Sequence, residues 1–156
     1  SICGTEIAHF HEELYTKYLD CESIPHITVV RDPVDRFFSA SIFLTRMYGD
    51  DIESLLEDES SFYSMIENFP LSEAVNWFRP QSDFIGGHTH IWWYENKLEN
   101  DFSDWMSDIL KVDFKIQNLE YSKLTTNETK KIKRTPKIIE NVKKLYSKDY
   151  KTLYPK

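Results

Sequence analysis

The stretch over residues 27–39 constrains the fold most, because a β-branched run passes through Arg-Asp-Pro into a helical pattern. Residues 27–30 are uninterrupted Ile-Thr-Val-Val, which predicts a central strand covered on both faces. Asp32 suits the N-cap of a helix, and Pro33 suits its first position, where no amide hydrogen is needed. Residues 34–47 then carry apolar side chains at helical spacing. The stretch therefore predicts a strand that leads directly into a helix.

This junction also gathers groups that bind anions. Arg31 precedes the predicted helix, and Arg36, Ser39 and Arg46 fall on one face of it. A helix N-terminus offers free amide hydrogens and the positive end of the dipole, and a guanidinium binds phosphate through paired hydrogen bonds. The junction therefore predicts an anion site. The alternative is an ordinary strand-to-helix connection whose arginines form surface salt bridges.

Composition limits the class of protein. The 156 residues are 40% hydrophobic and 15% aromatic, which predicts one globular domain over residues 1–156. The formal net charge of −7 argues against a nucleic-acid binder. No apolar run approaches the roughly 20 residues of a membrane span, and no signal peptide is evident. We therefore expect a cytoplasmic protein with no membrane segment. Cys3 and Cys21 fit neither a disulfide framework nor a zinc site.

The remaining pattern alternates helical and strand-like segments, which is typical of an α/β fold with a short, mostly parallel sheet flanked by helices. The strand is expected over residues 91–94. Apolar periodicity and capping residues predict the helices. They are expected over residues 6–19, 52–69 (one or two acidic helices), 73–78, 99–110 and 136–146.

The motif Arg31-Asp32-Pro33-x-x-Arg36-x-x-Ser39 closely resembles the 3′-phosphate motif of sulfotransferases that use 3′-phosphoadenosine-5′-phosphosulfate (PAPS). In that family the first arginine and the serine hold the 3′-phosphate. The resemblance implies a P-loop-type sulfotransferase fold, with Arg31 and Ser39 binding the cofactor and Arg36 supporting the site.

A pair of histidines precedes the motif. His9-x-His11, the motif and Gly-Asp-Asp at 49–51 together look like heparan sulfate 2-O-sulfotransferases and their relatives. There one histidine of such a pair is the general base, which implies that role for His9 or His11. On a regular helix the two side chains would point about 200° apart. His88 and His90, in an expected turn, form a rival pair.

Two further segments carry the resemblance. The sequence Trp-Phe-Arg-Pro-Gln-Ser-Asp-Phe at 77–84 resembles a segment that lines the active-site side of carbohydrate sulfotransferases. It implies that Arg79 and Gln81 bind an acidic or hydroxyl-rich acceptor, although a polar turn after a helix explains the residues better when they are taken by themselves. The sequence at 94–102 matches the family's passage from strand to helix. Trp92 and Trp93 could stack on a sugar or adenine, but a core position explains them better.

The implied reaction transfers a sulfuryl group from PAPS to a hydroxyl, expected on a carbohydrate, and leaves adenosine 3′,5′-bisphosphate. It requires no metal. The family's Lys-bearing loop for the 5′-phosphosulfate is not evident, because Cys3-Gly4-Thr5 lacks the lysine. Either the N-terminal strand and loop are missing or Gly4-Thr5 is a degenerate version of the loop, and the distance from His9 to Arg31 favours the first explanation. The alternative is a non-catalytic domain that binds adenosine 3′,5′-bisphosphate or another phosphorylated ligand. A kinase-like P-loop enzyme is disfavoured because Gly-x-x-x-x-Gly-Lys-Ser/Thr does not occur.

Overall fold

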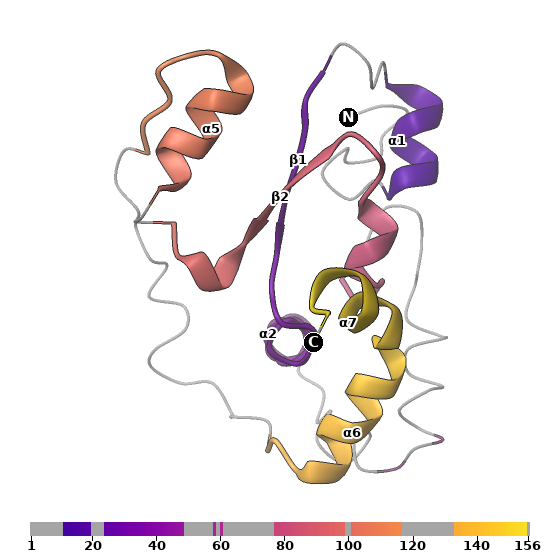
Figure 1. Ribbon diagram of the computed structural model, residues 1–156. Helices are drawn as coiled ribbons and strands as arrows, with labels where there is room; N and C mark the ends of the chain where they lie inside the picture. Colours follow the sequence, from indigo (N-terminus) through magenta and orange to yellow (C-terminus); the bar gives the residue numbers. More distant parts are fainter. Residues whose placement is uncertain are drawn as a thin grey trace.

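A computed structural model describes residues 11–19, 24–48, 58, 60, 77–98, 101–116 and 133–155 (Figure 1). Its α-helices are α1 (Glu12–Tyr18), α2 (Pro33–Tyr48), α5 (Phe102–Leu110), α6 (Pro136–Leu145) and α7 (Ser147–Leu153). Its strands are β1 (His26–Val30) and β2 (Thr89–Trp93), and two 3-10 turns are η2 (Gln81–Phe84) and η3 (Tyr94–Asn96). The predicted helices over 52–69 and 73–78 lie largely outside the described residues.

The two strands pair in parallel, so the α/β class with a small parallel sheet is confirmed. The register sets His26 opposite Thr89 and Val30 opposite Trp93, which brings both C-terminal ends to one edge (Figure 1). The prediction that β1 is covered on both faces is wrong, because Val29 is 45% exposed. The β-branched run reflects strand propensity here, and only Val30 is fully buried.

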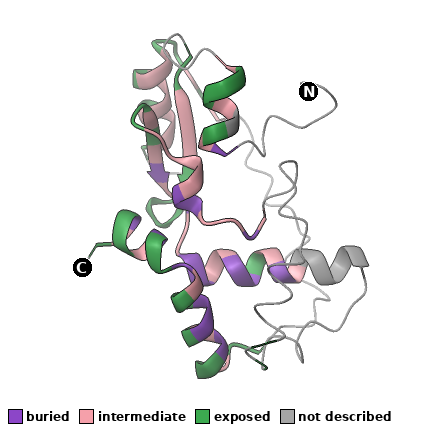
Figure 2. Ribbon diagram, turned by 90° about the vertical axis from the view of Figure 1, so that its right-hand side faces the viewer, coloured by how far each residue is buried: buried purple, intermediate pink, exposed green. Residues whose placement is uncertain are grey.

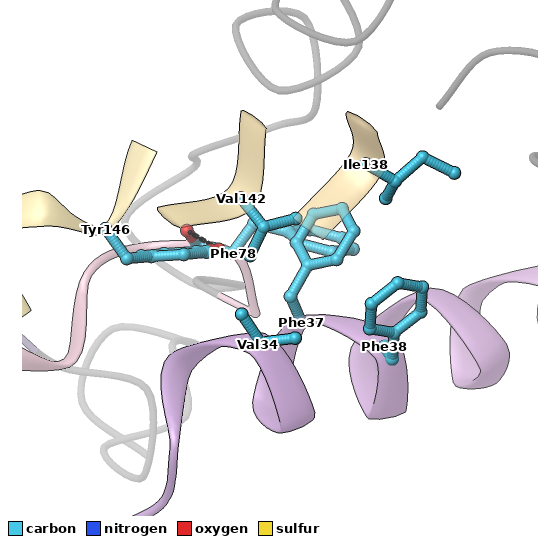
Figure 3. Packing of buried hydrophobic residues seen from close by; sticks show 7 residues of the cluster. All are labelled: Val34, Phe37, Phe38, Phe78, Ile138, Val142 and Tyr146. Atoms are coloured by element: carbon cyan, nitrogen blue, oxygen red, sulfur yellow. Dashed lines mark hydrogen bonds between the residues drawn. The ribbon is translucent and has the colours of Figure 1, made fainter. Parts of the chain in front are cut away.

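The core lies where α2 packs against α6. Phe37 is fully buried between the rings of Phe38, Phe78 and Tyr146. Figure 2 shows that α2 and α6 run crosswise with their buried positions in contact, and Figure 3 shows how the side chains interlock. The remaining members of this cluster are Val34, Ile138 and Val142. Helix α2 therefore projects its apolar stripe away from the sheet and holds β1 to the C-terminal helices.

Helix α1 is anchored at the opposite, N-terminal edge of the sheet. The ring of Tyr15 packs edge-on against His26, with centroids 4.3 Å apart, and its hydroxyl lies 3.4 Å from the hydroxyl of Thr89. Gly86 passes so close beneath this helix that a Cβ would lie 2.7 Å from a carboxylate oxygen of Glu12. A side chain at position 86 would therefore require the Glu12 carboxylate to move aside.

The C-terminal segment differs from the single predicted helix over 136–146. Pro136 opens α6 as expected and the Thr135 hydroxyl caps it, but the chain turns at Tyr146 and continues as α7. The turn forms because Tyr146 is fully buried and donates its hydroxyl to the Phe78 carbonyl at 2.8 Å. Within the described parts of the chain, no helix has the length and apolar character to cross a membrane.

Candidate functional site

The backbone of Arg31, which directly follows β1, is held by the side chain of Gln81. The Arg31 amide donates to Oε1 of Gln81 at 2.9 Å, and Nε2 of Gln81 donates back to the Arg31 carbonyl at 2.8 Å. Gln81 is 6% exposed, and the two hydrogen bonds of its side-chain amide imitate the pairing that a further strand would supply. The expected acceptor-binding role of Gln81 does not fit this geometry, because its amide group is already occupied by Arg31.

A buried carboxylate positions Gln81 in turn. Asp149 on α7 is fully buried, and its two oxygens accept from the amides of Gln81 and Ser82 at 2.8 and 2.9 Å. The first turn of η2 is thus capped from another helix. Arg79 lies beside it with its guanidinium 3.7 Å from the carboxylate of Asp83, and both side chains are only about a quarter exposed. The segment over residues 77–84 is therefore a connection that hydrogen bonds and an ion pair hold in place.

The start of α2 is capped from within the motif. Oδ1 of Asp32 accepts from the amides of Val34 and Asp35 at 2.9 and 3.1 Å, and the Arg36 amide donates to the Asp32 carbonyl. The N-cap and Pro33 at the first position are confirmed. The expectation of free amide hydrogens is wrong, because the short Asp32 side chain folds back onto them. Any anion at this junction must therefore be bound by side chains.

Arg36 supports the interior. It hydrogen-bonds the Tyr146 side chain and lies near the Asp149 carboxylate. Burial lowers the pKa of Arg36, while Tyr146 and Asp149 oppose that shift. Burial likewise raises the pKa of Tyr146, against the opposing effect of Arg36. These contacts give Arg36 a role in joining α2 to α6 and α7, and its support of a cofactor site stays a prediction.

Arg31 and Ser39 differ from the rest of the motif. The Arg31 guanidinium stacks over the Tyr94 ring at 5.0 Å, and the Ser39 hydroxyl is exposed on α2. In the described part of the chain, Arg31 forms no ion pair and the Ser39 hydroxyl forms no hydrogen bond. Stacking fixes the guanidinium plane and leaves its edge N–H groups available. Arg46 lies on α2, but its side chain is outside the described set.

The histidines are spread over different parts of the molecule. His9 lies outside the described residues. His11 is 7% exposed and occupies the N-cap of α1 without a side-chain capping bond. His88 and His90 are exposed, and His90 belongs to β2 rather than to the expected turn. Because α1 is anchored near His26, at the opposite edge from Arg31, the fold does not by itself join His11 to the motif.

Two tyrosines at the junction carry contacts that the motif did not reveal. The Tyr150 hydroxyl donates to Oδ2 of Asp32 at 3.1 Å, and the Tyr154 hydroxyl lies 3.4 Å from Oε2 of Glu95. Burial and the nearby carboxylate raise the pKa of Tyr150 to about 12, and the same causes raise the pKa of Tyr154. Their four-residue spacing on α7 was the signal in the sequence. Without the position of α7, it indicated only an aromatic stripe.

Two cavities flank this edge. One, of about 510 Å³, is lined by Lys143, Tyr150, Lys151, Tyr154 and Pro155. The other, of about 640 Å³, is lined by Trp92, Glu95, Asn96, Lys97, Asp101, Asp104, Trp105 and Asp108. Tyr154 lines the basic cavity and Glu95 lines the acidic one, so their side-chain contact separates two cavities of opposite charge.

Comparison with known proteins found no matching family model, no matching curated protein and no matching solved structure.

Proposed function

We propose that this chain is a PAPS-dependent sulfotransferase domain in which Arg31 and Ser39 bind the 3′-phosphate. One observation carries the proposal. Asp32, Pro33 and Arg36 of the motif cap and pack the fold. Among the described residues, the Arg31 side chain only stacks on Tyr94 and the Ser39 hydroxyl forms no hydrogen bond. A guanidinium whose N–H groups are available and an exposed hydroxyl, at the spacing of a phosphate motif, are best explained by a ligand.

The location supports this proposal. In α/β proteins, ligands bind beyond the carboxyl ends of parallel strands, which is where Arg31 follows β1. The basic cavity begins beside this point, because Tyr150 contacts Asp32 directly. Its two lysines suit phosphate groups and its two tyrosine rings suit a base. Its volume of about 510 Å³ is within the usual range for small-molecule sites.

The proposed chemistry assigns His9 or His11 as the base. PAPS supplies the sulfuryl group. The histidine takes the proton of an acceptor hydroxyl while that oxygen forms a bond to sulfur. The bond from sulfur to the bridging oxygen breaks, and its electron pair stays on the 5′-phosphate of adenosine 3′,5′-bisphosphate. The acceptor is a hydroxyl-bearing molecule, and we propose a carbohydrate.

A domain that binds adenosine 3′,5′-bisphosphate without catalysis is the second candidate. The burial of His11 at the far edge of the sheet favours it.

Calorimetric titration with adenosine 3′,5′-bisphosphate, followed by sulfate transfer from labelled PAPS to a panel of glycans, separates the two candidates. Binding with turnover supports the enzyme, and binding without turnover supports the second candidate. No binding would contradict both. Ser39→Ala should weaken binding several-fold, since it removes one phosphate hydrogen bond. The matched control is Ser147→Ala, at an exposed serine on α7, which should leave affinity unchanged.

A further inference from the structure

The acidic cavity beside η3 and α5 has a lining that does not suit a polyanionic acceptor. Four carboxylates face one ammonium, that of Lys97, so the formal charge of the lining is −3. A sulfated or uronic acid-rich glycan would be repelled at such a surface. The cavity therefore requires a ligand that is neutral or cationic.

The aromatic wall adds shape to this charge. The Trp92 and Trp105 rings lie 5.2 Å apart and tilted, and Phe102 packs edge-on against Trp92. Indole rings present flat apolar surfaces that accept the C–H face of a sugar ring and attract cations. Trp92 is only 7% exposed, and among the residues that the structure describes its buried indole N–H has no hydrogen-bond acceptor. A buried donor left without a partner is unfavourable, so a ligand acceptor that reached this N–H would stabilise the complex.

Three of the carboxylates are unpaired along one stripe. Asp101, Asp104 and Asp108 follow each other at spacings of three and four residues, which places them on one face of α5. In the described part of the chain, none of the three side-chain carboxylates forms an ion pair or accepts a hydrogen bond. Asp104 and Asp108 repel each other, and Asp108 opposes the negative end of the helix dipole. A bound cation would relieve both unfavourable interactions.

We propose that this cavity binds a sugar that carries a free amino group, with the ammonium held by Asp104 and Asp108 and the ring seated against Trp105. The ammonium complements the charge of the carboxylates, and the sugar ring packs against the indole rings. A volume of about 640 Å³ has room for a disaccharide. If the proposed sulfotransferase function holds, on which this assignment rests, the amino sugar is the acceptor, because Glu95 joins this cavity to the strand end through the Asp32 amide at 2.7 Å.

The test is calorimetric titration of the whole chain with the β-1,4-linked glucosamine disaccharide, without nucleotide. We expect it to bind at least tenfold more tightly than its N-acetylated counterpart and to weaken as salt increases. A disaccharide from heparin should not bind. Equal affinity for the two glucosamine forms, or tighter binding of the heparin disaccharide, would overturn the proposal.

Two variants distinguish binding at the acidic cavity from binding at the nucleotide site. Asp104→Asn/Asp108→Asn should weaken the amino sugar at least tenfold, leave adenosine 3′,5′-bisphosphate affinity unchanged and fold normally, because it removes exposed like charges. Asp113→Asn, at an exposed aspartate outside the cavity, is the matched control and should have no effect. An unchanged amino-sugar affinity in the double variant would overturn the assignment, even if the nucleotide binds. If the wild-type chain binds the amino sugar but not the nucleotide, only the proposed function is contradicted.

Discussion

The side-chain amide of Gln81 forms two reciprocal hydrogen bonds with the backbone of Arg31, 50 residues away in the sequence. This pair fixes the point at which β1 ends and the Arg31 side chain emerges. Asp149 holds Gln81 by its backbone, and Arg36 lies beside Asp149, so the motif helix and the strand end share one buried polar network.

Replacing Gln81 by Ala should lower the free energy of unfolding by about 1–3 kcal/mol, because the Arg31 amide and carbonyl lose their partners in a partly buried setting. Urea denaturation measures this change. Gln81→Glu places a buried carboxylate against the Arg31 carbonyl oxygen, and should destabilise the protein at least as much as Gln81→Ala. A wild-type midpoint for Gln81→Ala would show that the pair contributes nothing.

Asp149→Asn should destabilise the protein more, by about 3–5 kcal/mol, because it leaves the Arg36 charge without its buried counter-charge and removes an acceptor from η2. Chemical denaturation monitored by circular dichroism gives the value. Asp113→Asn is the surface control, since the ion pair of Asp113 with Lys115 is formed by two side chains that are about three-quarters exposed. That variant should stay within about 0.5 kcal/mol of wild type. Equal effects of the two substitutions would refute the network.

Stability should fall as the pH rises from 10 towards 12. The folded-state pKa values of Tyr146, Tyr150 and Tyr154 are raised, and that of Tyr150 reaches about 12. The unfolded chain loses these protons first, near pH 10, so it binds fewer protons than the folded chain and is favoured as pH increases. Tyrosinate absorbance at 295 nm should show delayed ionisation in the folded protein, and Tyr150→Phe should reduce the delay. Ionisation of every tyrosine near pH 10 in the folded state would contradict these burial effects.

Sequence features that act within a few residues predicted the strand-to-helix junction. Contacts between residues far apart in the sequence could not be predicted. The β-branched run, Asp32 and Pro33 act within a few residues, so β1, the N-cap and α2 could be predicted from the sequence. The burial of Asp149 could not be predicted, because an aspartate between lysine and tyrosine is typical of a surface helix. The turn at Tyr146 is what buries this side chain. The partners of Arg36 could not be predicted for the same reason. Its neighbours come from residues more than 100 positions later.

His11→Gln tests the proposed base. If His11 takes the hydroxyl proton, sulfate transfer should fall by about 10²–10⁴-fold, while adenosine 3′,5′-bisphosphate affinity stays the same. His88→Gln is the matched control in the rival pair, at an exposed position, and should retain transfer. The opposite pattern, with transfer lost in His88→Gln and kept in His11→Gln, would move the base to the other pair.

The most direct test of the central claim is a binding cycle between Arg31 and the 3′-phosphate. Affinities of wild type and Arg31→Ala for adenosine 3′,5′-bisphosphate and for adenosine 5′-monophosphate give the four corners. We predict that wild type prefers the bisphosphate by about 10–150-fold, equivalent to about 1.5–3 kcal/mol for a charge-assisted contact, and that Arg31→Ala loses this preference. An equal preference in both proteins would contradict the assignment of Arg31 to the 3′-phosphate.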